Sequence, residues 1–288
     1  MATMTASAHT HLNNVRRYYE QTRTDYRVLW QGSAQAIHVG YWDEHIRSHN
    51  ESLLEMNRQL AQAAGITGAD HVLDAGCGIG GSSRWLAKTY GACVTGISIT
   101  PFQVEQANVT TRKHGLHPLV HFELQDYTHT TFPAQSFSVV WFLESLVYAP
   151  DKCEAFKEVY RVLQPGGRLV IGDFTLADNL TSDQKSYMKP WWDGWAMPTL
   201  DTLPHFREAL CDTGFTDIRI VNLNAHVQRS LKRLWLMSKV ALPFARLFYE
   251  TGIFPDLRYQ NVAASVLQYE SFKKGLWQYA LITATKRK

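Results

Sequence analysis

Cysteine is scarce in this sequence, and its spacing follows no pairing pattern. The four cysteines, Cys77, Cys93, Cys153 and Cys211, are widely scattered and form no CxxC pair. A disulfide framework or a zinc site built from thiolates needs closer or paired spacing. We therefore expect reduced thiols and no thiolate metal site.

Long apolar runs are lacking as well. No segment has eighteen consecutive apolar residues, and the N-terminal stretch MATMTASAHTHLNN has no apolar run of the kind that a signal peptide carries. These two absences predict a cytoplasmic protein without stable membrane insertion.

Charge of one sign is not in excess, because the net charge is only +3. The sequence also lacks RNP, zinc-finger and basic-helix signatures. Nucleic acid is therefore not predicted as a partner, whereas a small-molecule substrate is. A homodimer is compatible with these features and stays open.

Two histidine pairs have the spacing of metal ligands on a helix. His45 and His49 lie four residues apart, as do His117 and His121. Neither pair lies in an HExxH context, and the second pair approaches a predicted strand. We predict no metal site from them, and whether a diphosphate substrate would bring a metal ion is left open.

The sequence does contain a regular alternation of short apolar runs and helical patterns. Hydrophobic residues make up 45% of it, which is enough for the core of a large α/β domain. Alternation of this kind indicates a Rossmann-like, mostly parallel sheet that is covered on both faces. The seven expected strands are residues 71–75, 92–99, 119–126, 137–144, 168–174, 216–223 and 277–286.

The N-terminal part carries helix signals of its own. Residues 1–12 are small and polar and are expected to be disordered, whereas a helix is expected from about residue 13 to residue 31. Ser48 with Glu51 fits a capping box at the start of a second helix.

Two long segments interrupt the later strands. Residues 175–203 and 224–276 are aromatic and read as mostly helical, and segments of this length inside a compact domain usually have a function. We expect them to form a helical substrate cap. The resulting division is 1–64 as N-terminal helices covering the active site, 65–174 as the cofactor-binding core, and 175–288 as the rest of the sheet with the cap.

A glycine-rich motif follows the first strand. In Val72-Leu73-Asp74-Ala75-Gly76-Cys77-Gly78-Ile79-Gly80-Gly81, a strand runs into a glycine loop and then into a helix. Glycines permit positive φ and close approach of a ligand, and the helix N-terminus offers free N–H groups to a carboxylate. A Rossmann dinucleotide site would have GxGxxG, whereas GxGxG after an acidic residue is the pattern for S-adenosylmethionine (SAM). A glycine turn in another kind of α/β protein is the alternative.

The ends of the next strands carry further marks. Ser98, Ile99 and Gln103 lie where the second strand meets its helix, and Gln125-Asp126-Tyr127 ends the third. LQPGGRLVI precedes the fifth strand. With these motifs, the chain resembles the sterol, tocopherol and cyclopropane-fatty-acid branch of class I SAM-dependent methyltransferases. The resemblance covers nearly the whole chain, from Tyr18-Tyr19-Glu20 through His38-Val39-Gly40-Tyr41-Trp42 to the last strand.

The resemblance implies SAM as cofactor and a set of residues that hold it. Many class I enzymes place an acidic residue at the end of the second strand for the ribose hydroxyls, where this chain has Ser98-Ile99. In the resembled branch the position of Gln103 takes over that contact, and Asp126 can accept the adenine amine. The cofactor residues implied are His38, Asp74, Gly76, Gly78, Gly80, Ser98, Ile99, Gln103, Gln125, Asp126 and Tyr127.

One carboxylate is the catalytic candidate. Glu144 lies at the carboxyl end of the fourth strand between Leu143 and Leu146, where a solvated surface charge is not expected. A carboxylate there can stabilise a cation and accept a proton, as methylation of carbon requires. A structural or capping carboxylate is the alternative. Tyr148 is the second catalytic candidate. Relatives often carry His at this position, so Tyr148 is a departure from their catalytic pair.

Substrate contacts are predicted from aromatic and basic residues. Arg16, Arg23 and Arg27 share one helix face and could bind a phosphate, although a solvated face with Glu20 beside it is the favoured interpretation. The cluster around Trp191–Trp195 forms either cap core or pocket wall. The candidate substrate residues are Arg23, Arg27, Tyr41, Trp42, Trp192 and Trp195.

These features lead to one preferred function and two alternatives. The preferred one is SAM-dependent methylation of carbon in a small hydrophobic metabolite, either an isoprenoid alkene such as a prenyl diphosphate or a prenylated ring. The first alternative is N- or O-methylation of a small amine, alkaloid or phenol. The second is a SAM-binding regulator without turnover.

Overall fold

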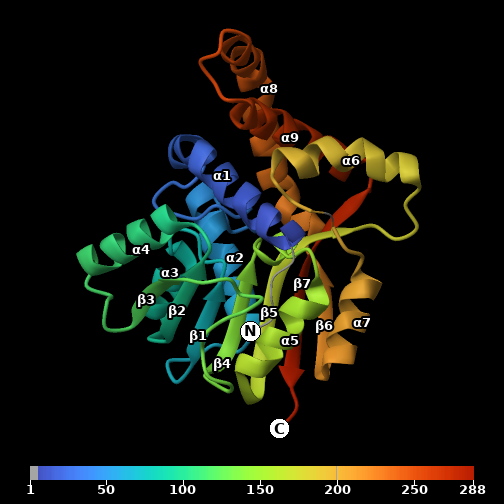
Figure 1. Ribbon diagram of the computed structural model, residues 1–288. Coiled ribbons are helices and arrows are strands. Elements are labelled where there is room, and N and C mark those ends of the chain that lie inside the picture. The colour runs from blue at the N-terminus through green and yellow to red at the C-terminus, as the bar shows by residue number, and fades with distance from the viewer. Residues whose placement is uncertain (1–5, 199) are drawn as a thin grey trace.

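The computed structural model describes residues 6–198 and 200–288, and these form a seven-stranded sheet with helices on both faces (Figure 1). The strands are β1 (His71–Ala75), β2 (Cys93–Ser98), β3 (Val120–Leu124), β4 (Phe137–Leu143), β5 (Leu163–Leu176), β6 (Phe215–Asn222) and β7 (Trp277–Lys286). The helices are α1 (Ala6–Leu29), α2 (His49–Ala63), α3 (Gly81–Tyr90), α4 (Pro101–Lys113), η1 (Leu146–Tyr148), α5 (Lys152–Val162), α6 (Ser182–Gly194), α7 (Leu203–Thr213), α8 (Asn224–Glu250) and α9 (Asp256–Lys273).

The strand order is β3-β2-β1-β4-β5-β7-β6, with β7 antiparallel to both of its neighbours. The expected Rossmann-like, mostly parallel sheet is therefore confirmed. Strand β5 starts five residues earlier than expected, at Leu163 rather than residue 168. A register shift lets the Pro165-Gly166-Gly167 turn stay within this strand beside β4. Helix α7 was not expected from the sequence.

Two apolar layers hold the helices to the sheet. Met56 and Leu60 of α2 and Leu86 of α3 are fully buried with Val139 of β4 on one face. On the opposite face, Phe156 of α5 and Leu210 of α7 pack with Phe142 of the same strand. β4 thus turns alternate side chains to opposite faces and is covered on both, as a central parallel strand requires.

The N-terminus departs from the expectation of disorder. Helix α1 begins at Ala6 and is continuous to Leu29, so the expectation is wrong for residues 6–12, whereas residues 1–5 lie outside the described residues. Tertiary contacts account for this: the His11 Nε2 donates a 2.8 Å hydrogen bond to the carbonyl oxygen of Tyr148, and Val15 is buried.

Helices from the N-terminal and C-terminal parts of the chain form a cap. Helices α1, α6, α8 and α9 lie above the sheet in Figure 1, where α9 packs against the other three. The capping box at Ser48 and Glu51 is confirmed, but α2 packs on the face of the sheet, so of the first two helices only α1 reaches the cap.

Candidate active site

A cavity of about 660 Å³ lies between the carboxyl ends of the strands and the cap. Its polar wall comes from the ends of β1 to β4, and includes Asp74, Ser98 and Asp126. Its apolar wall comes from the cap, with Val15 of α1 and Met237 of α8 among its members. A volume of this size accommodates small-molecule ligands.

The glycine loop has the backbone that the sequence predicts. Gly76, Gly78 and Gly80 all have positive φ, at 90°, 54° and 78°. A Cβ on Gly76 would lie 2.3 Å from the Cβ of Ser145, so no side chain fits there. A Cβ on Gly78 would meet only Ile37 Cδ1 at 3.7 Å, and Gly78 lines the cavity. The loop therefore offers bare backbone to a ligand.

Asp74 stands behind this loop and is almost fully buried. Its Oδ2 accepts a 2.5 Å hydrogen bond from the Ser83 hydroxyl. Burial raises the pKa of Asp74 to about 6, against the lowering effect of Ser83 and the Arg84 guanidinium. The carboxylate is therefore tied to the first turn of α3 and helps to fix the loop.

The ends of the second and third strands also meet at the cavity. The Ser98 hydroxyl donates a 2.8 Å hydrogen bond to Gln103 Oε1, which orients that buried amide. Asp126 Oδ1 accepts from the backbone N–H and the hydroxyl of Thr128, both at 2.9 Å. The Tyr127 hydroxyl donates to the Ser145 carbonyl oxygen at 2.9 Å. Of the cofactor residues implied by the sequence, those lining the cavity are His38, Asp74, Gly76, Gly78, Ser98, Ile99, Gln103, Gln125, Asp126 and Tyr127.

His38 contributes a polar atom that the described residues do not satisfy. Its Nδ1 donates a 2.9 Å hydrogen bond to the Val39 carbonyl oxygen, and burial lowers its pKa to about 4, so the ring is neutral. Nε2 is then an acceptor, buried and without a partner among the residues described. A buried polar atom is costly unless a ligand or water bonds to it.

This wall fits SAM. The bare glycine backbone, the first turn of α3 and the unsatisfied His38 Nε2 offer hydrogen bonds to a polar ligand, while Ile99 and Tyr127 offer apolar surface. Gly80 serves differently, since it is the N-cap of α3 in a left-handed conformation rather than a wall residue. SAM supplies an electrophilic methyl group when it is bound.

Glu144 lies at the end of β4 in a strained conformation. Its φ is +53°, which is uncommon for a side chain of this size, and its N–H donates to the Gly172 carbonyl oxygen at 2.8 Å. Oε1 accepts from the Val39 N–H at 2.7 Å and from the Tyr279 hydroxyl at 2.9 Å. The carboxyl lines the cavity.

Burial raises the pKa of Glu144 to about 8, and the negative charge of Asp173 adds to the increase. The hydrogen bonds from Val39 and Tyr279 lower the pKa without cancelling the effect of burial. Such a group gains and loses a proton near neutral pH, which suits a general acid or base.

Three residues around Glu144 escaped the sequence reasoning. Asp173 is buried behind it, accepts from the backbone N–H groups of Val147 and Phe174, and has a pKa raised to about 7 by burial. Tyr279 comes from the antiparallel β7, and Tyr19 comes from α1. Asp173 had a signal, because it is a lone acidic residue in a buried strand, and Tyr19 belongs to a motif of the family resemblance, but Tyr279 had no signal.

Tyr148 lines the cavity and joins a group of tyrosines. Its hydroxyl accepts a 3.0 Å hydrogen bond from the Tyr19 hydroxyl, and burial raises its pKa well above the usual value. Nearby, the hydroxyls of Tyr18 and Tyr26 are 2.6 Å apart, and Tyr18 donates to Asn261 Oδ1 at 2.8 Å. At neutral pH these side chains are neutral hydrogen-bonding groups.

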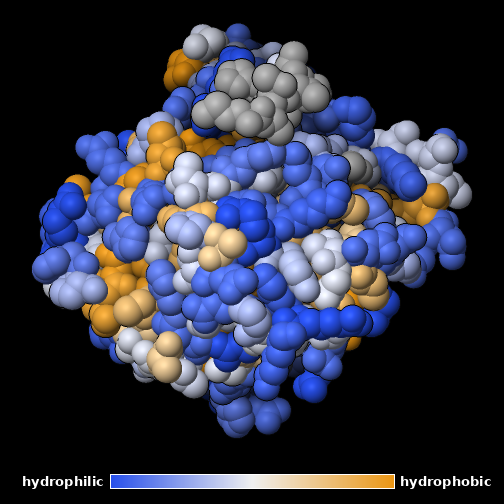
Figure 2. All heavy atoms as spheres, turned by 60° about the horizontal axis from the view of Figure 1, so that its bottom comes forward, coloured by the Kyte–Doolittle hydropathy of each residue, from blue (hydrophilic) through white to orange (hydrophobic). Residues whose placement is uncertain are grey.

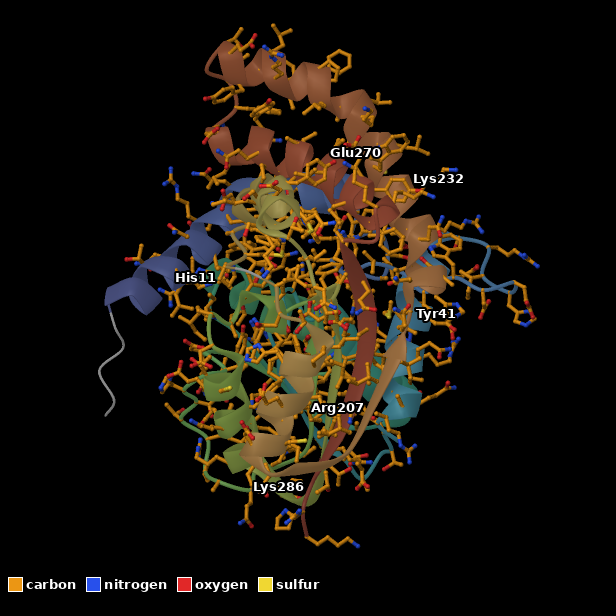
Figure 3. The ribbon with its side chains drawn as sticks, turned by 90° about the vertical axis from the view of Figure 1, so that its right-hand side faces the viewer. His11, Tyr41, Arg207, Lys232, Glu270 and Lys286 are labelled. Carbon is orange, nitrogen blue, oxygen red and sulfur yellow. The ribbon has the colours of Figure 1, made fainter. Side chains whose placement is uncertain are left out.

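The predicted substrate residues do not all meet at the cavity. Trp195 lines it, whereas Trp192 is buried in the core behind it. Tyr41 stacks on His226 with ring centroids 4.0 Å apart, and the Trp42 Nε1 donates to Ser230 Oγ at 3.0 Å. In Figure 3, Tyr41 lies on the opposite side of the molecule from His11 of α1.

The arginine face of α1 lies beside the cavity and does not line it. The Arg16 Nε donates a 2.8 Å hydrogen bond to the Ile99 carbonyl oxygen. Arg23 is exposed, with its guanidinium 4.9 Å from the centre of the Phe102 ring, and Arg27 lies beside it in a shallow groove between α1 and α4. Among the described residues that line the main cavity, none is Lys or Arg.

Comparison with known proteins places the chain in a family. The model of a family described as a methyltransferase domain matches residues 66–228, more than half of the chain. The chain belongs to the class I SAM-dependent methyltransferases, and its resemblance to the tocopherol and sterol methyltransferases is confirmed.

Two curated relatives illustrate the range of this family. The chain is 34% identical over 223 residues to the 2-methyl-6-phytyl-1,4-hydroquinone methyltransferase of Synechocystis sp., a match covering 74% of this chain and 69% of that protein. It is also 34% identical over 165 residues to methyltransferase GfsG of Streptomyces halstedii, where the match covers 57% of this chain. The match spans 58% of the length of GfsG, less than two thirds.

A solved structure has the same fold. The crystal structure of the [4+2]-cyclase SpnF is similar with a TM-score of 0.77 and 22% identity, over 95% of each chain. This similar structure is named as a cyclase, whereas the relatives above are named as methyltransferases. The fold by itself therefore does not define the reaction.

Proposed function

We propose that this chain transfers the methyl group of SAM to carbon in a neutral, largely apolar small molecule, with a prenylated phenolic ring as the preferred acceptor. The observation that carries the proposal is the buried Glu144, with a pKa of about 8, at a cavity whose cap wall is apolar. The printed activity of the Synechocystis relative, a hydroquinone methyltransferase, supports the same class of acceptor.

Glu144 gives this acceptor what it needs. Attack by a ring carbon leaves a cation until a proton is lost, and loss of a phenolic proton makes the ring more nucleophilic. A carboxyl whose pKa lies near neutral pH can take up such a proton. Positioning in the cavity adds its own contribution, on the order of 7–11 kcal/mol for a two-reactant step.

Of the two isoprenoid acceptors expected from the sequence, the geometry favours the prenylated ring over the prenyl diphosphate. A diphosphate would enter a cavity lined by Asp25, Asp126 and Glu154, with no Lys or Arg among the described lining residues. Each charge-assisted hydrogen bond that it could not form is worth roughly 1.5–3 kcal/mol. Arg23 and Arg27, which were candidates for this contact, lie outside the cavity.

O-methylation of a phenol is the second candidate. It would use the same cavity and the same base, since removal of the phenolic proton leaves oxygen as the nucleophile. Relatives named as tocopherol O-methyltransferase and erythromycin 3''-O-methyltransferase support it. An amine acceptor needs no ring deprotonation, and a SAM-binding regulator would need the polar wall but neither Glu144 nor the apolar wall of the cavity.

The test is product analysis with SAM that carries a trideuterated methyl group. The panel contains prenylated hydroquinones, isoprenyl diphosphates, simple phenols and small amines. We expect label on a ring carbon of a prenylated hydroquinone, located by tandem mass spectrometry and NMR. Label on the hydroxyl oxygen would support the second candidate, and turnover of a diphosphate or an amine alone would refute the neutral ring.

A further inference from the structure

Helix α8 has an exposed apolar face that no other described element covers. Leu236, Val240, Phe244 and Leu247 are 50%, 71%, 60% and 54% exposed. Their spacing of four, four and three residues places them on one side of the helix. Of the ten large hydrophobic residues that are exposed in the described part of the chain, seven lie between Leu236 and Ile253. They therefore form a patch, which marks an interaction site more often than single exposed residues do.

The packing of α8 at the cavity does not explain why its exposed face is apolar, because other residues of the helix make that contact. The neighbouring side of the helix contains Leu234, Met237 and Ala241, which line the cavity. The helix is thus apolar on two sides, one inward and one outward. Figures 1 and 3 show the α8–α9 hairpin projecting from the body of the molecule, and Lys232 and Glu270 label its two helices in Figure 3. The face of the body in Figure 2 is mostly hydrophilic, with apolar side chains in small separate groups.

The hairpin is also the basic part of the chain. Residues 224–276 contain eight Lys or Arg and three Asp or Glu, a net charge of +5, whereas the rest of the chain contains 21 and 23, a net charge of −2. On α8, Lys232, Lys239 and Arg246 are exposed beside the apolar face. Glu250 and Glu270 offset part of this charge through contacts with Arg246 and Lys239.

We propose that the exposed face of α8 docks reversibly on an anionic lipid bilayer. An apolar helix face with basic residues at its edge is the pattern of helices that lie in the bilayer interface, where apolar burial and attraction to anionic lipid both contribute. No helix among the described residues is long and apolar enough to cross a membrane, so the contact is with the surface.

A second copy of the chain is a less suitable occupant. A symmetric contact would place the same basic edge on both sides of the interface. Two hairpins with a net charge of +5 each would then repel, whereas an anionic surface attracts them.

If the proposed function is right, docking would have a consequence for the substrate. Because one side of α8 lines the cavity and the other would contact lipid, an apolar acceptor dissolved in the bilayer would reach the cavity along the same hairpin. Docking would thus place the apolar cavity beside the bilayer in which an apolar acceptor dissolves.

The experiment is co-sedimentation of the full chain with vesicles of phosphatidylcholine, with and without phosphatidylglycerol. The test variant is Val240→Glu with Phe244→Glu. The control is Val109→Glu with Val221→Glu, which removes two other exposed apolar side chains and adds the same charge. We expect the test variant to bind anionic vesicles about 10-fold more weakly or worse, and the control to stay within about twofold of the parent after allowance for its charge.

Two results would overturn docking on lipid. One is equal binding by the two double variants, and the other is a dimer of the parent chain, measured by sedimentation velocity, that the test variant abolishes. Methylation of short-chain, water-soluble acceptors is measured in parallel without vesicles. If the parent chain methylates these acceptors but does not bind vesicles, docking is wrong and the proposed function stands. If the parent chain binds vesicles but methylates none of the acceptors, docking stands and the proposed function is wrong.

Discussion

The hydroxyl of Tyr279 donates a 2.9 Å hydrogen bond to Oε1 of Glu144, although the two residues lie 135 positions apart in the sequence. Tyr279 comes from β7, which runs antiparallel between β5 and β6, and Glu144 follows the end of β4. The Val39 N–H bonds to the same oxygen. The carboxyl that we propose as the base is therefore held by two donors from separate parts of the chain.

Replacement of this carboxyl separates chemistry from cofactor binding. In Glu144→Gln the shape is kept and the base is lost, so kcat should fall by about 10²-fold or more. SAM affinity, measured by calorimetry, should change little. Glu154→Gln removes another carboxylate of the cavity wall and should keep kcat within a few-fold. A normal kcat for Glu144→Gln would mean that this residue is structural.

The pH dependence of the rate should report on the pKa of Glu144. Because the deprotonated form is the base and its pKa is about 8, kcat should rise as pH increases through that value. The Tyr279 hydrogen bond lowers this pKa, so Tyr279→Phe should move the profile to higher pH.

Tyr41→Phe is the matched control, since the Tyr41 hydroxyl contacts His226 away from the cavity. Its profile should coincide with that of the parent chain. A Tyr279→Phe variant that loses rate equally at every pH would show that Tyr279 acts only through packing.

The glycine loop can be tested with two substitutions that strain the backbone alike. Gly78 and Gly115 have φ values of +54° and +70°, so valine is unfavourable at both. Only Gly78 lines the cavity, and a Cβ on Gly115 would meet nothing within 4 Å. Gly78→Val should therefore abolish SAM binding in calorimetry, while Gly115→Val should retain it. Equal affinities in two folded variants would refute the cofactor site.

The arginines of α1 distinguish a neutral acceptor from a diphosphate. Arg23 and Arg27 lie outside the main cavity, so Arg23→Gln and Arg27→Gln should leave KM for the acceptor within about twofold. A diphosphate held by these side chains would lose a charge-assisted hydrogen bond, and KM would rise about 10- to 100-fold. Initial-rate measurements with the active acceptor decide between the two.

Local sequence patterns were enough to predict the sheet, the glycine loop and the place of Glu144. These are local features: apolar runs specify buried strands, and GxGxG after a strand specifies a loop with positive φ at Gly76 and Gly78. The position of Glu144 directly after a buried strand brought it to the carboxyl edge of the sheet, where ligands bind in such folds.

The packing of distant segments determines which side chains surround that carboxyl and which helix faces meet the cavity. Helical spacing shows that Arg16, Arg23 and Arg27 share a face, but rotation of α1 about its axis depends on what it packs against, and here it turns Tyr19 inward. Tyr279 and Asp173 reach Glu144 through strand order, which no local pattern encodes. The raised pKa of Glu144 follows from burial by these distant segments, so it is a property of the packed fold.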